Sequence, residues 1–133
     1  MLHKNAYATR RPYDADLRAL LSQFEGQAAR RRLSGWSGVS LHPTPAWSMP
    51  GLAKVLGIAS LTIKDESKRS TLGSFKALGA PNALVKLVLR RFADRHWSDA
   101  DVLAGRHAQA LADFVVISAT DGNHGRALAA AAQ

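Results

Sequence analysis

The stretch Lys64-Asp65-Glu66-Ser67-Lys68-Arg69-Ser70-Thr71-Leu72-Gly73-Ser74-Phe75-Lys76-Ala77-Leu78-Gly79 decides how this chain is expected to fold. Residues 60–64 alternate in polarity, which predicts a strand. A polar, glycine-containing loop follows, and Lys76 then stands at the start of a helical pattern. Desolvation in an aromatic setting and the positive end of a helix both disfavour the ammonium form of a lysine. Only a neutral amine attacks an aldehyde to form a Schiff base. Lys76 is therefore a candidate nucleophile, although most lysines in such loops are surface residues.

A second informative stretch is Ser118-Ala119-Thr120-Asp121-Gly122-Asn123-His124-Gly125-Arg126. The apolar run before it, residues 114–118, predicts a buried strand, and residues 126–133 predict a helix. Open α/β sheets place ligand sites where a strand ends and a helix begins, because free backbone N–H groups gather there. Two glycines would let the backbone approach a ligand closely. The same pattern also fits an ordinary Asp-Gly turn.

The remaining elements are predicted from helix caps, prolines and apolar periodicity. The predictions are a helix from Asp14 ending near Gly26, a loop over 30–38, an extended segment at 42–45, a helix from Pro50 to Gly57, a helix over 82–95 and a helix from Ser98 or Asp99 through Leu111. Strands that alternate with helices indicate an α/β fold, with incomplete parallel or mixed sheets and flanking helices.

Taken together, the two stretches resemble those of pyridoxal-phosphate (PLP) dependent enzymes of fold type II, the tryptophan-synthase-β type. In these enzymes the cofactor lysine lies in a Gly-Ser-Phe-Lys motif, and a Ser-x-Gly-Asn loop, the asparagine loop, follows it. The pattern is most similar to the diaminopropionate ammonia-lyase family, with Lys-Asp-Glu at 64–66, Phe-Lys-x-Leu-Gly at 75–79 and Ala-Thr-Asp-Gly-Asn-His-Gly-Arg at 119–126. Pro43-Thr44-Pro45 resembles the Pro-Thr-Pro segment that precedes the cofactor lysine.

The resemblance implies a role for each site residue. Lys76 would carry PLP as a Schiff base and move protons, and the side-chain amide of Asn123 would donate to the phenolic oxygen of the cofactor. Thr120, Asp121, Gly122 and Asn123 would bind the substrate, with the backbone near Thr120 and Gly122 holding its carboxylate. We interpret Asp121 as the group that recognises a second amino group or moves the Cα proton, and a helix N-cap is its alternative role. Asp65 and Glu66 are interpreted as structural partners of nearby cations.

The expected reaction is α,β-elimination of ammonia from 2,3-diaminopropionate, giving pyruvate and ammonia. A serine/threonine dehydratase or racemase of the same fold type is the alternative, because Gly73-Ser74 before Phe75 fits those enzymes as well. Asp121 favours the lyase. The resemblance also implies an amino-acid substrate and a homodimer in the full-length enzyme.

The resemblance implies a domain organisation too. Residues 1–80 would begin the larger, PLP-binding domain, and residues 81–133 would begin the smaller domain with the asparagine loop. The chain ends inside a predicted helix, and the family's phosphate-binding loop and the residue facing the pyridine nitrogen would lie further along. We therefore expect an N-terminal part of a longer enzyme that is inactive alone.

Composition narrows the other possibilities. The 133 residues contain no cysteine, which excludes disulfides and thiolate metal sites and suits a cytoplasmic protein. The longest apolar runs are far shorter than the roughly 18 residues of a membrane span, and five scattered histidines predict no metal site. The net charge of +8 leaves a basic nucleic-acid-binding protein as a distant alternative. Aromatic residues are not interleaved with the basic ones, so no nucleic-acid partner is expected.

Overall fold

The computed structural model describes residues 5–6, 12–120 and 122–133. In chain order, its α-helices, strands and 3-10 helices (η) are α1 (Ala15–Leu20), α2 (Gln23–Leu33), β1 (Ala46–Ser48), α3 (Pro50–Leu56), β2 (Thr62–Lys64), η1 (Glu66–Lys68), η2 (Phe75–Leu78), α4 (Ala80–Arg91), η3 (Ala93–Arg95), α5 (Asp99–Leu103), η4 (Gln109–Leu111) and α6 (Asn123–Ala132). None of the helices in these ranges is long and apolar enough to cross a membrane.

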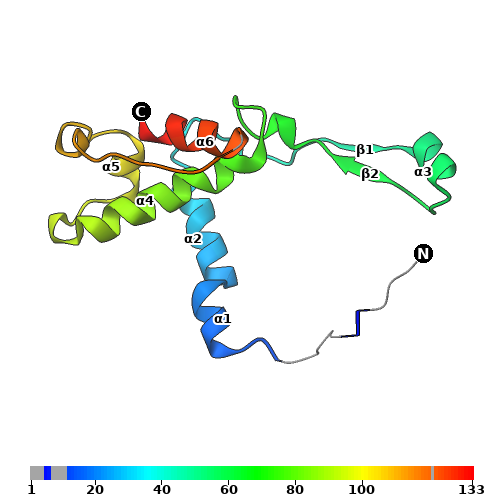
Figure 1. The fold of residues 1–133 in the computed structure, drawn as a ribbon, viewed down its shortest axis with the longest axis horizontal. Helices are drawn as coiled ribbons and strands as arrows, with labels where there is room; N and C mark the ends of the chain where they lie inside the picture. The colour runs from blue at the N-terminus through cyan, green and yellow to red at the C-terminus, as the bar shows by residue number, and fades with distance from the viewer. Residues whose placement is uncertain (1–4, 7–11, 121) are drawn as a thin grey trace.

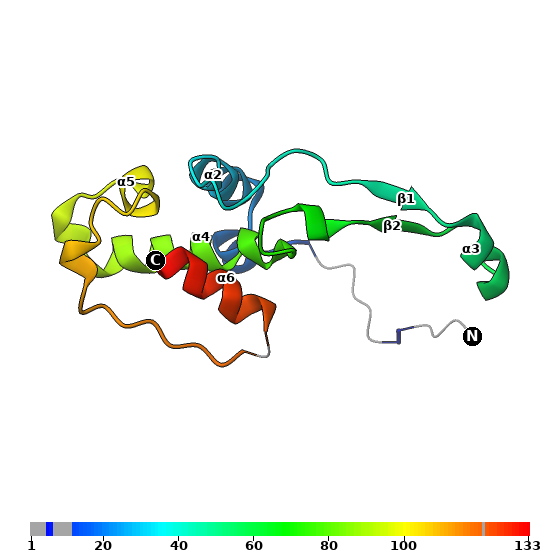
Figure 2. The same cartoon turned by 90° about the horizontal axis from the view of Figure 1, so that it is seen from above.

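The molecule consists of a helical body, a projecting arm, and the helices α2 and α1, which extend from the body in another direction (Figures 1 and 2). The body contains α4, α5 and α6. The arm contains β1 and β2, and α3 lies at its tip between the two strands. The strands pair antiparallel, with Trp47 opposite Ile63. The predicted strand at 60–64 is thus confirmed as β2. A parallel or mixed sheet was expected, whereas the sheet that the described residues form is this antiparallel pair.

The core of the body lies along one face of α4. The apolar spacing of the predicted 82–95 helix placed Val85, Val88, Leu89 and Phe92 on one stripe. Val85 and Val88 are buried as expected, Leu89 and Phe92 are half-buried, and Leu84, which was not predicted, is buried beside them. Helix α6 packs across α4 and also against η2. Ala77 of η2 and Ala127 of α6 are both small and have no exposed surface, which fits the close packing of these two elements. This contact brings the two informative stretches of the sequence together.

The N-terminal helix differs from the prediction. Asp14 caps α1 as expected, because its side chain accepts a hydrogen bond from the N–H of Leu17. A second helix begins after Ser22, whose hydroxyl accepts from the N–H of Glu25 at 3.1 Å. This Ser-x-x-Glu spacing is a helix-start signal that overrides the continuous apolar pattern. Gly26 therefore lies inside α2, and the predicted loop over 30–38 is helical as far as Leu33.

The predicted strand at 114–118 is wrong in this structure. Residues 114–120 form no ladder with any other described residue. Val115 and Ile117 point outward, 76% and 89% exposed, while Phe114 and Val116 are half-buried. The alternation of a strand is present, but hydrogen-bonded strand structure requires a neighbour.

The other helices begin within three residues of their predicted starts, but α4 and α5 end earlier than predicted. Gly57 ends α3 in the left-handed conformation, with φ 65°. Helix α4 stops at Arg91, and Ser98 caps α5 as expected. Gly105, with φ 69°, separates α5 from Leu111, which lies in η4 rather than in the same helix. Helix α6 begins at Asn123, three residues before the predicted start.

Candidate active site

Lys76 lies in the first turn after a serine cap. The hydroxyl of Ser74 accepts a hydrogen bond from the N–H of Lys76 at 3.2 Å, and this bond starts η2. The neighbouring Ala77 is buried against α6, whereas the Lys76 side chain is exposed. Its Nζ lies 4.8 Å from the centre of the Phe75 ring. The aromatic neighbour is confirmed, but the described residues do not supply the desolvation that was expected around the amine.

The asparagine loop leads directly into α6. Asn123 is the first residue of the helix, and Gly122 before it has φ 148°, a conformation that L side chains rarely adopt. Both residues are exposed. Asp121 lies outside the described residues. The position just before the helix is Gly122, which has no side chain to cap it.

Thr120 has a role that was not predicted. Its Oγ1 accepts hydrogen bonds from the N–H of Gly122 at 3.3 Å and from the N–H of Gly125 at 2.8 Å. It was predicted as a substrate ligand, and in this structure its oxygen is engaged by the loop itself. The hydroxyl hydrogen is still available to donate to another group.

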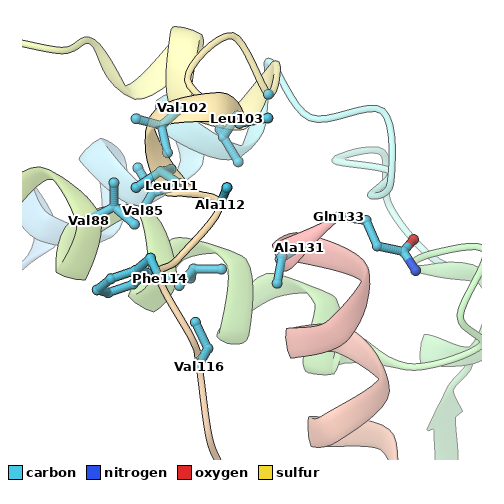
Figure 3. A pocket seen from close by; sticks show the side chains of 14 residues that line it. Val85, Val88, Val102, Leu103, Leu111, Ala112, Phe114, Val116, Ala131 and Gln133 are labelled. Carbon is cyan, nitrogen blue, oxygen red and sulfur yellow. The ribbon is translucent and has the colours of Figure 1, made fainter.

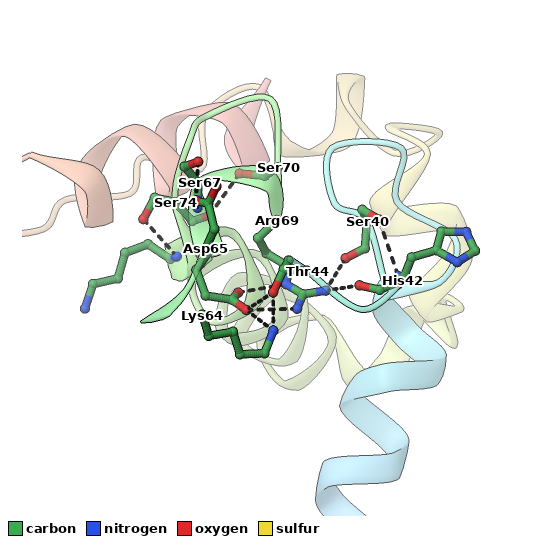
Figure 4. Close-up of polar contacts among 11 residues, drawn as sticks. Ser40, His42, Thr44, Lys64, Asp65, Ser67, Arg69, Ser70 and Ser74 are labelled. Atoms are coloured by element: carbon green, nitrogen blue, oxygen red, sulfur yellow. Dashed lines mark hydrogen bonds and ion pairs between the residues drawn. The ribbon is translucent and has the colours of Figure 1, made fainter. Parts of the chain in front are cut away.

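A polar network holds the loop that leads toward Lys76 (Figure 4). The carboxylate of Glu66 accepts from Arg69 Nε at 2.9 Å, from Lys64 Nζ at 2.6 Å and from Thr44 Oγ1 at 2.6 Å. Lys64 also contacts the Thr44 hydroxyl directly. The predicted structural role of Glu66 is confirmed.

Two members of this network extend it to other segments. The Arg69 guanidinium donates to the backbone carbonyls of Ser40 at 2.7 Å and His42 at 2.9 Å. Thr44, predicted only as part of an extended Pro-Thr-Pro segment, is buried. Residues 40–44 are thereby tied to residues 64–69. No signal in the sequence indicated the bonds from Arg69, because they end on main-chain oxygens.

Asp65 belongs to a different local motif. Its carboxylate accepts from the Ser67 N–H at 3.1 Å and from the Ser67 hydroxyl at 2.5 Å. The hydroxyl bond is the main reason why the pKa of Asp65 is lowered. The carboxylate thus starts η1 and is bonded to Ser67 rather than to a neighbouring cation.

An apolar cavity of about 330 Å³ lies elsewhere, between α4, α5 and the end of α6 (Figure 3). Val88, Leu103, Phe114 and Val116 are among the side chains that line it. Lys76 and the asparagine loop do not contribute to it, and its lining has no titratable side chain. It is therefore a gap in apolar packing and not the place where an amine and a carboxylate would be handled. Within the ranges that the structure describes, no group of three His, Cys, Asp or Glu side chains could hold a metal ion.

Comparison with known proteins identifies the family. The family described as "Pyridoxal-phosphate dependent enzyme" matches residues 39–133. Diaminopropionate ammonia-lyase of Escherichia coli K12 is 32% identical over 126 residues, which cover 91% of this chain and 29% of that enzyme. Diaminopropionate ammonia-lyase of Salmonella typhimurium is 38% identical over 96 residues, 68% of this chain and 23% of that enzyme. No solved structure matches.

The chain thus spans less than a third of the length of these relatives. The family match covers β1, β2, η2, α4 and α6, and includes both Lys76 and Asn123. The expected cofactor class and the observed family agree. This chain belongs to the pyridoxal-phosphate dependent enzymes.

Proposed function

We propose that this chain supplies the cofactor lysine and the asparagine loop of an enzyme that eliminates ammonia from 2,3-diaminopropionate. The observation that supports this most directly is the packing of α6 on η2 through Ala77 and Ala127. It joins the element that begins with Asn123 to the element that carries Lys76. The names of the relatives from Escherichia coli and Salmonella typhimurium support the same reaction.

The side chains present fit the aldehyde end of PLP. The Lys76 amine is exposed, and within the described part of the chain it has no hydrogen-bond or ion-pair partner. An amine in this condition can reach an aldehyde carbon without first breaking an ion pair. Asn123 is likewise exposed at the start of α6. Its amide has no hydrogen-bond partner among the described side chains and can donate to an oxygen of the cofactor.

The tasks of the proposed reaction are divided among Lys76, Asn123 and Thr120. When bound, PLP supplies an electron sink that stabilises negative charge at the substrate Cα. Lys76 Nζ would hold the cofactor and, as a free amine, would accept the Cα proton of the substrate. Asn123 orients the cofactor ring through its phenolic oxygen. The Thr120 hydroxyl hydrogen and the loop N–H groups that do not donate to Thr120 Oγ1 hold the substrate carboxylate.

Asp121 is the residue that we assign to substrate choice. A carboxylate next to the substrate carboxylate is repulsive unless it meets a positive charge or a proton. The second amino group of diaminopropionate provides the positive charge, and serine does not. The products are pyruvate and two molecules of ammonia, with one water consumed.

The domain division at residue 80, the homodimer and the cytoplasmic location also belong to the proposal. The family resemblance implies the domain division and the homodimer, and the absence of cysteine suits the cytoplasmic location. Each is open to a direct measurement: limited proteolysis, sedimentation and cell fractionation, respectively.

The cofactor assignment is tested by chemical trapping. Borohydride reduction of the PLP-loaded, full-length enzyme, followed by peptide mapping, should find PLP on Lys76. Lys76→Ala should abolish this link and lower turnover by at least about 10²–10⁴-fold, since it removes both the anchor and the base. Lys68→Ala, at an exposed lysine of the same loop, should leave both unchanged. A label on Lys64, Lys68 or Lys86 would overturn the assignment.

The substrate assignment is tested by kinetics at Asp121. Asp121→Asn keeps the shape and removes the charge, so turnover of diaminopropionate should fall by about 10²-fold or more while the PLP absorbance is retained. Serine should be measured beside it, because the dehydratase alternative predicts turnover of serine in the unmodified enzyme. Asp113→Asn, at an exposed aspartate, is the matched control. Unchanged elimination from diaminopropionate would leave Asp121 without a catalytic role.

A further inference from the structure

The start of α6 has an unusual cap. The first N–H groups of a helix have no partner within the helix, and the residue before the helix normally satisfies one of them with its side chain. Here that residue is Gly122, which has no side chain. The N–H of Gly125 is bonded instead to Oγ1 of Thr120, five residues earlier in the chain, at 2.8 Å. The same oxygen accepts from the N–H of Gly122 at 3.3 Å.

The Thr120 side chain also lies directly against Gly125. A Cβ atom at position 125 would stand 3.2 Å from Thr120 Oγ1 and 3.3 Å from Thr120 Cβ, and it would approach Thr120 Cγ2 more closely than real Cβ atoms do. Rotating the Thr120 side chain would remove this clash. However, it would also withdraw Oγ1 from the two N–H groups whose hydrogen bonds it accepts. The hydroxyl and the methyl group of Thr120 thus constrain the loop together.

We propose that Thr120 is a positioning residue, and that position 125 must be glycine because the Thr120 methyl group occupies the space that a Cβ atom would need. The pair sets where α6 begins and how the backbone at Gly122 and Asn123 is held. Because α6 packs on η2, it also sets the placement of the loop relative to the element that carries Lys76. The positioning of α6 by this pair does not require the cofactor, whereas its catalytic consequence rests on the proposed function.

Two substitutions at position 120 separate the role of the hydroxyl oxygen from the role of the methyl group. Thr120→Val keeps the shape and removes the acceptor, so the N–H groups of Gly122 and Gly125 should exchange with solvent about fivefold faster or more in the cofactor-free chain. Thr120→Ser keeps the acceptor and removes the methyl group, so exchange should stay near that of the unmodified chain. If both N–H groups exchanged in Thr120→Val at the same rate as in the unmodified chain, the inference would be overturned.

The complementary surface is tested by a double-mutant cycle. Gly125→Ala should disturb α6 and accelerate exchange at Gly122, and Thr120→Ser in the same chain should restore slow exchange, because it removes the methyl group that the new Cβ meets. Gly26→Ala is the matched control, since Gly26 is also helical and a Cβ added there would have no atom within 4 Å. If Gly125→Ala were as harmless as Gly26→Ala, or if Thr120→Ser gave no rescue, the inference would be wrong.

A kinetic measurement tests whether this positioning of α6 affects catalysis. In the PLP-loaded enzyme, Gly125→Ala should lower kcat for diaminopropionate, and the added Thr120→Ser change should recover it. If Lys76 does not carry PLP, the proposed function is wrong and the kcat values no longer test the positioning role. The exchange measurements do not depend on PLP, so the two failures are distinguishable. Rescue of exchange without rescue of kcat in an enzyme that carries PLP on Lys76 would reject the positioning role.

Discussion

Glu66 shows how a single carboxylate can join separate parts of the chain. Its side chain is 25% exposed and accepts from Arg69, Lys64 and Thr44. These bonds, that from Arg69 above all, hold its pKa well below the usual range. A carboxylate whose pKa is lowered by folding stabilises the folded state above its unfolded pKa, about 4.3 for Glu. This stability is lost as the pH falls from there through the lowered folded value.

We expect Glu66→Gln to lower the melting temperature at neutral pH and to flatten its decline between about pH 4.3 and more acidic pH. The amide keeps the shape but cannot pair with Arg69 and Lys64 as an anion. Thermal melts followed by circular dichroism over this pH range would measure both effects. Glu25→Gln is the control, because the ion pair of Glu25 with Lys86 is well exposed and contributes little. Equal behaviour of the two variants would contradict the structural role of the Glu66 network.

At the scale of elements, the contact between η2 and α6 depends on small side chains. Ala77 and Ala127 are fully buried, so the two backbones lie close together and a larger side chain has no space. The same contact fixes the proposed placement of Lys76 in η2 relative to Asn123 in α6. A change that separates the elements should therefore affect both stability and the relation of the two motifs.

We expect Ala127→Val to destabilise the chain by about 1–3 kcal/mol, the usual cost of overpacking a tight core. Ala129→Val, on an exposed position of the same helix, should change stability by about 0.5 kcal/mol or less. Both variants carry the same small helix-propensity cost of a β-branched residue, so their difference reports packing alone. Urea titrations with a common slope would give the two values. A difference near zero would mean that α6 does not pack on η2 as described.

At the scale of the whole molecule, much apolar surface is uncovered. Val115 and Ile117 are exposed along an extended segment that forms no strand ladder with the other described residues. Trp47 and Val55 are 56% and 82% exposed on the arm. Exposed apolar patches and unpaired extended segments promote association. The 133 residues alone should therefore associate at micromolar concentrations.

The segment at 114–118 provides the test. Val115→Lys together with Ile117→Lys should shift the sedimentation of the 133-residue chain toward the monomer, because charge on an extended segment opposes edge pairing. Gln27→Lys together with Gln109→Lys, at two exposed polar positions, adds the same charge elsewhere and is the control. A monomeric unmodified chain, or an equal effect of both pairs, would contradict the prediction.

The sequence by itself determined the features that arise from local interactions. The cap at Asp14, the end of α3 at Gly57 and the buried stripe of α4 follow from neighbouring residues, because caps, glycine conformations and apolar periodicity act within one or two turns. The family was likewise evident from short motifs around Lys76 and Asn123. The roles of these two residues in catalysis stay predictions.

Tertiary structure decided the features that require a partner distant in the chain. Residues 114–118 have the alternation of a strand but no strand beside them among the described residues, and strand structure consists of bonds to a neighbour. The Glu66 carboxylate reaches Thr44, 22 residues away. The two motifs meet only because Ala77 and Ala127 allow η2 and α6 to pack closely. Such contacts depend on the three-dimensional path of the chain, which local patterns do not contain, and so the structure alone could assign them.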